Sequence, residues 1–256
     1  EKMVKQSGEV IRGSGGGGDR EGDKLENLLE ESGIESEMIV DHKLETTIKT
    51  RVIAQHQQLV RIDFENSPTH EILDKTLGRF SDLVADADVI VFSDYGKGGL
   101  QHISQMIRQA KSLNKCVLVD PKGSDYEKYR GASYITPNKA ELMSVLGQWS
   151  TEEELSAKVS ALRERLDLEG VLLTRSEEGM SLYQKGSVNH FSTAAKEIYD
   201  VSGAGDTVIG ILAVMLGINY DIEHAVISAN RAAGIVVGKL GTATTSFDEL
   251  FFEDGK

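Results

Sequence analysis

Short apolar runs alternate with longer segments of helical periodicity through the middle of the chain. The runs have the length of buried strands and contain few polar residues, which is typical of strands that are covered on both faces. Strands buried in this way form a parallel sheet with helices packed on each side. We therefore expect strands at residues 87–93, 116–120, 132–136 and 170–174.

Helices are expected between these strands and after them. The segment at 151–167 is rich in charged residues, which indicates an outer helix that faces solvent. The fold class is thus α/β with a mostly parallel sheet, and residues 180–191 add a hairpin that turns near Lys185. The other expected helices lie at about 23–31, at 100–113, from 138 onward, at 205–217 and at 221–238.

A different pattern occupies residues 45–63. β-Branched residues are dense here, and apolar and polar positions partly alternate, which predicts a small half-exposed sheet separate from the main core. Lys49 and Arg51 would project from one face of this sheet, because they are two positions apart. Apolar residues such as Ile48 and Leu59 would need cover, so we expect a β lid that also joins two copies in a homodimer.

The first 24 residues differ from the remainder in composition. Their glycine-rich stretch predicts a flexible linker. It contains G-x-G-x-x-G at Gly13, Gly15 and Gly18, but no predicted strand precedes it and no apolar helix follows, so a dinucleotide fingerprint is rejected. We assign residues 1–24 to a linker-like or engineered segment and residues 25–256 to a single α/β domain.

The composition excludes several classes of function. The formal net charge of −13 argues against nucleic acid as a partner, although local Lys and Arg can still bind a small anion. No run of roughly 18 apolar residues suits a membrane span, and no apolar segment near the N-terminus suits a signal peptide. Cys116 is the only cysteine, so no internal disulfide can form. These features lead us to expect a cytoplasmic protein with no membrane partner.

The stretch at 200–206 joins a tight glycine-rich turn to the start of an apolar helix. A helix N-terminus offers backbone N–H groups and partial positive charge, so it suits an anion such as phosphate. Gly203 and Gly205 let the backbone approach a ligand closely. Asp206 places a carboxylate beside this anion site, where it could accept a proton from a hydroxyl that attacks phosphorus. The structural alternative is a helix start with an acidic cap.

Polar residues also follow each expected strand at its carboxyl end, where open α/β sheets bind ligands. Asn138 could be a helix cap with Glu141 as its capping-box partner, and Asp94 with Lys97 could be a solvated loop pair. Four such groups in one chain nevertheless favour a ligand site over coincidence. The groups lie at residues 93–98, 120–123, 137–141 and 174–179.

These residues resemble the ribokinase-like (PfkB) family of sugar kinases. Residues 200–206 resemble its signature D-T-x-G-A-G-D, with two departures, and residues 138–141 resemble its N-x-x-E motif. Residues 174–179 resemble its nucleotide segment T-x-G-x-x-G, with Ser176 where glycine is usual. The resemblance covers about residues 23–250 and implies a three-layer α/β/α fold with a small β lid.

The resemblance further implies an ATP-dependent kinase that phosphorylates D-glycero-β-D-manno-heptose 7-phosphate at O1, a step in the synthesis of the lipopolysaccharide core. Asp206 would deprotonate the sugar hydroxyl. Gly203, Ala204 and Gly205 would hold the transferred phosphoryl group through their N–H groups. Segments similar to the family members with this activity lie at 47–54, 93–98, 119–123 and 237–242.

The same resemblance implies the ligand contacts. Glu141 with Asn138 would hold Mg²⁺, partly through water, and Asp200 with Ser202 would form a monovalent-cation site suited to K⁺. The residues implied to contact ATP are Lys122, Asn138, Thr174, Ser176, Gly179 and Asn230. Those implied to contact the sugar phosphate, which needs cations, are Lys49, Arg51, Asp94 and Lys97.

Two alternatives remain open. One is a kinase for another sugar or nucleoside on the same fold. The other is a non-catalytic protein that binds ATP only, because two substrate-binding features of the family do not appear before Leu25. These features are a first buried strand that ends in Gly-Asp and a later Gly-Gly loop with an Asn. ATP binding without sugar-dependent turnover would single out this second alternative.

Overall fold

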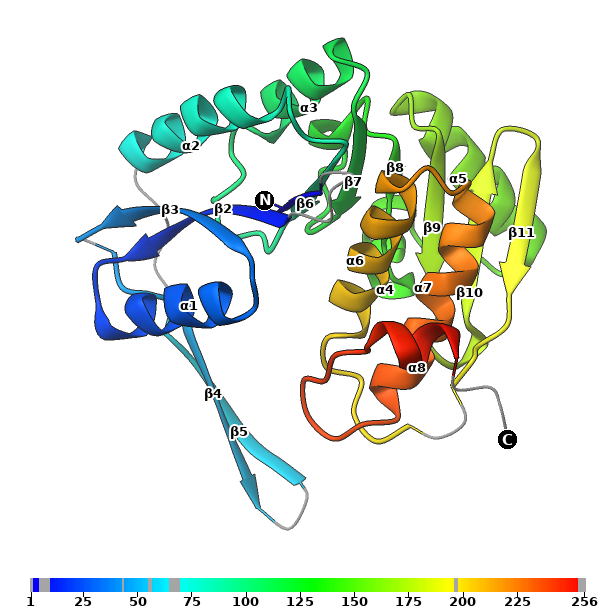
Figure 1. Cartoon of the computed structure of the whole chain (residues 1–256). Coiled ribbons are helices and arrows are strands. Elements are labelled where there is room, and N and C mark those ends of the chain that lie inside the picture. Colours follow the sequence, from blue (N-terminus) through cyan, green and yellow to red (C-terminus); the bar gives the residue numbers. More distant parts are fainter. Residues whose placement is uncertain are drawn as a thin grey trace.

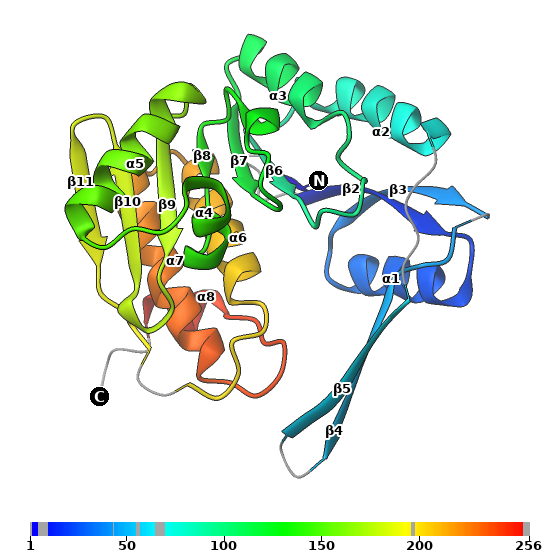
Figure 2. The same cartoon turned by 180° about the vertical axis from the view of Figure 1, so that it is seen from behind.

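The computed structural model describes residues 2–4, 10–42, 44–54, 57–64, 70–195 and 198–252. In these ranges the chain forms an α/β body and a two-stranded hairpin that projects from it (Figures 1 and 2). The body carries most of the residues implied to bind ligands, and the hairpin carries Lys49 and Arg51.

Parallel strands make the middle of the main sheet. β6 pairs with β7, β7 with β8 and β8 with β9, all in parallel, as the continuous apolar runs predict. These strands are β6 (Val89–Ser93), β7 (Cys116–Asp120), β8 (Tyr134–Ile135) and β9 (Gly170–Thr174). All four predicted strands are confirmed, although β8 is only two residues long.

Antiparallel pairings extend the sheet on both sides. β10 (Met180–Gln184) and β11 (Ser187–Phe191) form the predicted hairpin next to β9. On the other side β1 (Lys2–Val4) lies antiparallel between β6 and β2 (Val10–Gly17), and β2 pairs in parallel with β3 (Glu35–Asp41). The described strands have the order β11-β10-β9-β8-β7-β6-β1-β2-β3. All of them except β1 and β10 run in one direction, so the prediction of a mostly parallel sheet is confirmed.

Helices cover both faces of this sheet and create two cores. Side chains alternate between faces along a strand, so Ile90 and Phe92 of β6 pack into one core and Val89 and Val91 into the other. Helices α2 to α5 line the first core, and α6 and α7 line the second. The helices are α1 (Arg20–Glu31), α2 (His70–Leu83), α3 (Ile103–Ser112), α4 (Lys139–Leu146), α5 (Glu152–Arg165), α6 (Ala204–Gly217), α7 (Ile222–Val237) and α8 (Phe247–Phe251).

This arrangement is the three-layer α/β/α architecture expected from the sequence. The predicted helices are confirmed, with ends that differ by a few residues from those expected. In the described ranges, no helix combines the length with the apolar character that a membrane crossing requires.

The projecting hairpin consists of β4 (Ile48–Ala54) and β5 (Gln57–Phe64). Its register pairs Ile48 with Phe64 and Val52 with Val60, so these four residues share one face. All four side chains are exposed, from 39% for Ile48 to 55% for Phe64. Lys49 and Arg51 occupy the alternate positions of β4, on the other face by register. The small separate sheet predicted at 45–63 is therefore confirmed as a two-stranded element with an uncovered apolar face.

The linker predicted for residues 1–24 is wrong where the structure describes the chain. β2 is a strand of the main sheet, and α1 already begins at Arg20, before the predicted boundary at residue 25. The glycines near the end of β2 serve close packing. A Cβ added to Gly17 would lie 2.5 Å from the Leu44 carbonyl oxygen, and one added to Gly22 would lie 2.3 Å from the Gly17 carbonyl oxygen. Composition suggested flexibility here, whereas contact with neighbouring backbone explains Gly17 and Gly22.

Asp19 links this glycine-rich turn to the base of the hairpin. Its Oδ1 accepts a hydrogen bond from the Gly22 N–H at 2.8 Å and caps α1. Its Oδ2 accepts one from the Thr46 N–H at 2.7 Å, two residues before β4 begins. The Thr46 hydroxyl in turn accepts from the Gly17 N–H at 3.1 Å. These contacts fix the point at which the hairpin leaves the body.

Candidate active site

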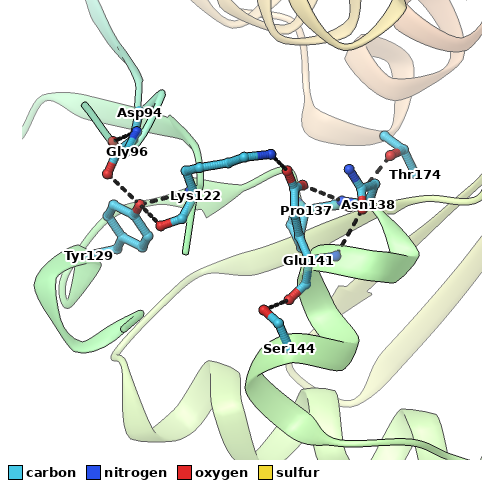
Figure 3. Close-up of polar contacts among 9 residues, drawn as sticks. All are labelled: Asp94, Gly96, Lys122, Tyr129, Pro137, Asn138, Glu141, Ser144 and Thr174. Atoms are coloured by element: carbon cyan, nitrogen blue, oxygen red, sulfur yellow. Dashed lines mark hydrogen bonds and ion pairs between the residues drawn. The ribbon is translucent and has the colours of Figure 1, made fainter. Parts of the chain in front are cut away.

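The carboxyl ends of the parallel strands bring their loops into direct contact. The Asp94 N–H, after β6, donates to the Asp120 carbonyl at the end of β7, 2.9 Å away. The Thr174 N–H, at the end of β9, donates to the Pro137 carbonyl after β8 at 3.0 Å. Figure 3 shows polar side chains of these loops reaching toward one another. The sequence prediction that polar groups gather at this edge is confirmed.

Lys122, Asn138 and Glu141, three residues implied to bind ATP or Mg²⁺, lie together. Asn138 caps α4: its Oδ1 accepts from the Glu141 N–H at 2.9 Å, and Glu141 Oε2 accepts from the Asn138 N–H at 3.0 Å. The other oxygen, Glu141 Oε1, accepts from Lys122 Nζ at 2.7 Å (Figure 3). This carboxylate raises the pKa of Lys122. The capping box considered as a structural alternative is thus present, and it orients Glu141 toward Lys122.

Asp94 is held by its own loop network. Its Oδ1 accepts from the Gly96 N–H at 2.7 Å. Its Oδ2 accepts from Lys128 Nζ at 2.6 Å and from the Tyr129 hydroxyl at 2.7 Å. Burial raises the pKa of Asp94, but these donors outweigh burial and leave the pKa below its ordinary value. The contact of Asp94 with a sugar phosphate stays a prediction, because in this structure its carboxylate serves the loops.

The predicted anion site lies at the start of α6. Gly203 has a φ of 82°, a left-handed conformation that favours glycine, and it caps the helix. Gly205 and Asp206 are exposed in the first turn, and a Cβ added to Gly205 would meet nothing within 4 Å. The N–H groups of such a turn have no partner inside the helix. The Ala204 N–H donates to the Val201 carbonyl at 3.3 Å, whereas the space beside Gly205 is open where a phosphoryl group was expected.

Asp206 faces the loop that follows β6. The Tyr95 hydroxyl donates to Asp206 Oδ1 at 3.3 Å, so the first turn of α6 and the loop after β6 meet at this carboxylate. The negative charge of the Asp206 carboxylate also acts on Asp120, at the end of β7. Burial, with the negative charges of Glu141 and Asp206, raises the pKa of Asp120 to about 7. The negative charges of Glu141 and of the predicted base, Asp206, therefore both act on Asp120.

The side chains here fit Mg²⁺. In the described ranges no three His, Cys, Asp or Glu side chains are arranged as a metal-binding group. Mg²⁺ nevertheless keeps several waters and needs only one or two carboxylates when it is bound with phosphates. Glu141 offers a hard oxygen ligand, and the repulsion of Asp120 by Glu141 and Asp206 is the kind that a cation relieves.

In the segment at 174–179, backbone conformation and close contacts account for several of the residue types. Ser176 has a φ of 53°, so the structure places a left-handed conformation where the resembling motif has glycine. Gly179 has a φ of 92°, and a Cβ there would lie 2.0 Å from the Phe191 carbonyl oxygen. Arg175 is buried and pairs with Glu152 at 2.5 Å, which ties the segment to α5. Contacts of Thr174, Ser176 and Gly179 with ATP stay predictions.

The remaining implied site residues are spread more widely. Asn230 is buried in α7, and its Nδ2 donates to the Ser192 carbonyl at 2.6 Å. Asp200 Oδ1 accepts from the Ser202 N–H at 2.8 Å in the turn before α6. Lys97 is exposed in the loop after β6. The hairpin that carries Lys49 and Arg51 extends on the side to which β9 points (Figures 1 and 2).

The structure also shows residues that the sequence did not single out. Lys128 and Tyr129 contact Asp94, while Tyr95 and Asp120 lie in two of the expected polar groups without having been given a role of their own. Asp120 could have been found, since it follows a buried strand as the other candidates do. Tyr129 carries no such signal, because it follows no predicted strand and its neighbours in the sequence, Lys128 and Arg130, are typical of a solvent-exposed segment.

Comparison with known proteins places the chain among sugar kinases. A model of the pfkB family of carbohydrate kinases matches residues 14–249. The D-beta-D-heptose 7-phosphate kinase of Bordetella bronchiseptica is 45% identical over 91% of this chain and 75% of its own length. The bifunctional protein HldE of Pasteurella multocida is 45% identical over 91% of this chain, which spans only 49% of that relative.

Solved structures support the same fold. The ribokinase of Thermotoga maritima superposes with a TM-score of 0.78 and 23% identity, covering 94% of this chain and 79% of its own. A likeness at this identity shows the fold alone, and it confirms the ribokinase-like prediction.

Proposed function

The chain belongs to the pfkB family of carbohydrate kinases, and we propose that it uses ATP to phosphorylate a heptose 7-phosphate at O1. The turn at Gly203 carries this proposal, because it presents an open helix N-terminus with Asp206 in its first turn. The relatives named for heptose 7-phosphate kinase activity support the substrate class. The reaction would provide the 1,7-bisphosphate for lipopolysaccharide core synthesis in the cytoplasm.

The geometry at α6 supports the following route for phosphoryl transfer. Asp206 accepts the proton of the sugar O1 hydroxyl while that oxygen bonds to the γ-phosphorus of ATP. The bond from the γ-phosphorus to the β,γ-bridging oxygen breaks, and ADP leaves with the bonding electron pair. The N–H groups of Gly203, Ala204 and Gly205 stabilise the negative charge on the transferring oxygens. The hydroxyl of Tyr95, 3.3 Å from Asp206 Oδ1, restrains the direction of the carboxylate.

The nucleotide would lie over the loops that follow β7, β8 and β9. Lys122 would contact its phosphates, and Thr174, Ser176, Gly179 and Asn230 would line the rest of its site. When bound, Mg²⁺ neutralises phosphate charge, and Glu141 with Asn138 would hold it, partly through water. Asp200 and Ser202 would hold a monovalent cation such as K⁺ in the turn before α6.

The hairpin would complete the sugar site. Its two faces differ in character: Ile48, Val52, Val60 and Phe64 share one, and Lys49 and Arg51 occupy the other by register. We assign the apolar face to a second copy in a homodimer, because exposed apolar residues in this number are costly in water. Lys49 and Arg51, with Lys97 and Asp94 of the body, would then serve the sugar phosphate.

The test is ADP release in the presence of Mg·ATP and D-glycero-β-D-manno-heptose 7-phosphate. Replacing Asp206 by Asn should lower kcat by about 10²–10⁴, the range typical of a lost general base. Asp23→Asn is the matched control, since Asp23 is an exposed acid in the first turn of α1. ATP binding without sugar-dependent turnover would instead support the non-catalytic alternative. Turnover with another sugar or a nucleoside, but none with heptose 7-phosphate, would retain the kinase and change its substrate.

A further inference from the structure

Tyr129 lies outside every motif in the sequence, yet its hydroxyl joins two loops of the carboxyl edge. Its side chain, at the end of the short 3₁₀ helix Glu127–Tyr129, is fully buried. The hydroxyl donates to Asp94 Oδ2 at 2.7 Å and accepts from the Lys122 N–H at 2.9 Å. The Lys122 carbonyl oxygen lies 3.1 Å away as a second acceptor. One buried hydroxyl therefore binds the loop after β6 and the loop after β7 together.

Lys122 continues this connection to the next loop. Its backbone is held by Tyr129, and its side chain runs past Gly96, where a Cβ would lie 3.3 Å from Lys122 Cγ. The ammonium group then reaches Glu141 Oε1 at 2.7 Å. Figure 3 shows this path from Asp94 through Tyr129 and Lys122 to Glu141. The side chains of Asp94, Lys122 and Glu141 are thus linked by contacts that start at a buried residue.

We propose that Tyr129 is a positioning residue for the nucleotide end of the site. It does not reach a ligand itself. It fixes the backbone of Lys122. The exposed ammonium group therefore samples fewer positions and stays beside Glu141. This role rests on the proposed function, in which Lys122 contacts the phosphates of ATP.

Tyr126 supplies a control within the same structure. It is as deeply buried as Tyr129, with 1% of its surface exposed, and its ring packs edge-on against Tyr129 at 5.4 Å between centroids. Among the described residues, however, its hydroxyl has no hydrogen-bond partner. Replacing either tyrosine by Phe removes one buried oxygen from the same cluster. Only one of the two changes removes the contact with Lys122.

The kinetic experiment compares Tyr129→Phe with Tyr126→Phe in the full chain. Tyr129→Phe should raise KM for Mg·ATP about three- to tenfold, because Lys122 loses the hydrogen bond that holds its backbone. The same change removes the hydrogen bond to Asp94 Oδ2, so KM for heptose 7-phosphate should rise as well. Tyr126→Phe should change neither constant by more than about twofold. Lys122→Met should also raise KM for Mg·ATP. If Tyr129 acts through Lys122, the double variant should be no worse than Lys122→Met alone.

A second readout does not depend on turnover. The Lys122 amide should exchange with solvent deuterium at least about fivefold faster in Tyr129→Phe and at the parental rate in Tyr126→Phe. Three results would each overturn the positioning role of Tyr129. The two Phe variants could change KM for Mg·ATP equally, the double variant could raise KM by the product of the two single effects, or the exchange rate of the Lys122 amide could stay unchanged in Tyr129→Phe. If the parental chain phosphorylates no heptose, the proposed function fails. The ATP dissociation constant and the amide exchange then still decide for or against Tyr129.

Discussion

Asp120 shows how one carboxyl group can make stability depend on pH. Burial and the charges of Glu141 and Asp206 raise its pKa from 3.8 to about 7, so the folded chain binds this proton more tightly than the unfolded chain. The contribution of Asp120 to the free energy of unfolding therefore falls as pH rises from about 4 to about 7. Below about pH 4 the carboxyl group is protonated in both the folded and the unfolded chain, so its contribution to the free energy of unfolding no longer changes with pH.

Asp120→Asn should consequently stabilise the protein at high pH. We expect its Tm to exceed the parental Tm at pH 8 and to match it more closely at pH 4.5, because the variant has no charge to bury. The measurement is thermal unfolding at both pH values without divalent cations. Asp23→Asn is the control and should show no such difference. A gain in Tm that is the same at both pH values would contradict an origin in ionisation.

Substitutions at Ser176 and Gly179, which lie in one segment, should have different effects on the stability of the fold. Ser176→Gly relieves a left-handed conformation and should be neutral or stabilise the fold by about 1 kcal/mol. Gly179→Ala should destabilise it by about 2–3 kcal/mol or more, since the new Cβ would lie 2.0 Å from the Phe191 carbonyl oxygen. Urea denaturation measures both changes. Equal losses in the two variants would show that backbone conformation does not limit this segment.

The sequence predicted that polar loops gather at one edge of the sheet, but not how their side chains are engaged. Asn138 and Glu141 were weighed as a capping box or a ligand pair, and the cap is present. The sequence predicts Asp94 as a substrate contact, while in the structure its oxygens accept from Gly96, Lys128 and Tyr129. Such partners lie up to 35 residues away along the chain, so no local pattern reveals them.

Elements were predicted best where burial dictates the pattern. The runs at 116–120 and 170–174 could only be covered strands, and the structure has them as β7 and β9. The failure occurred at the end of β2, where four glycines in succession, at 15–18, resemble a linker. Their role is set by the backbone of Leu44 and by the His42 side chain, which pack against Gly17 and Gly18. Tertiary contact therefore overrode composition at this strand.

The hairpin offers a prediction about assembly. Val52→Lys places a charge on the face shared with Ile48, Val60 and Phe64, and it should convert the expected dimer into a monomer. Light scattering across micromolar concentrations measures this change. Leu28→Lys is the matched control, because Leu28 is 60% exposed on α1 of the body. A parental protein that is already monomeric would refute the dimer.

For the whole molecule, the stabilisation of the fold by ATP should depend on Mg²⁺. ATP with Mg²⁺ at about a hundredfold excess over its Kd should stabilise the fold by about 2.7 kcal/mol. EDTA should abolish most of this gain, because the nucleotide phosphates would then meet Asp120, Glu141 and Asp206 without a neutralising ion. The readout is Tm with ATP, with and without Mg²⁺. The full gain in the presence of EDTA would contradict the placement of these carboxylates near the phosphates.

The attachment of the hairpin at Asp19 and Thr46 gives it the mechanics of a lever. β4 is seven residues long, which corresponds to a length of roughly 23 Å at a strand rise of about 3.3 Å per residue. A rotation of about 10° at the base would therefore carry the tip through roughly 4 Å. Two hydrogen bonds to one carboxylate set the angle at that pivot. A change too small to disturb the body can thus determine how far the far end of the hairpin travels.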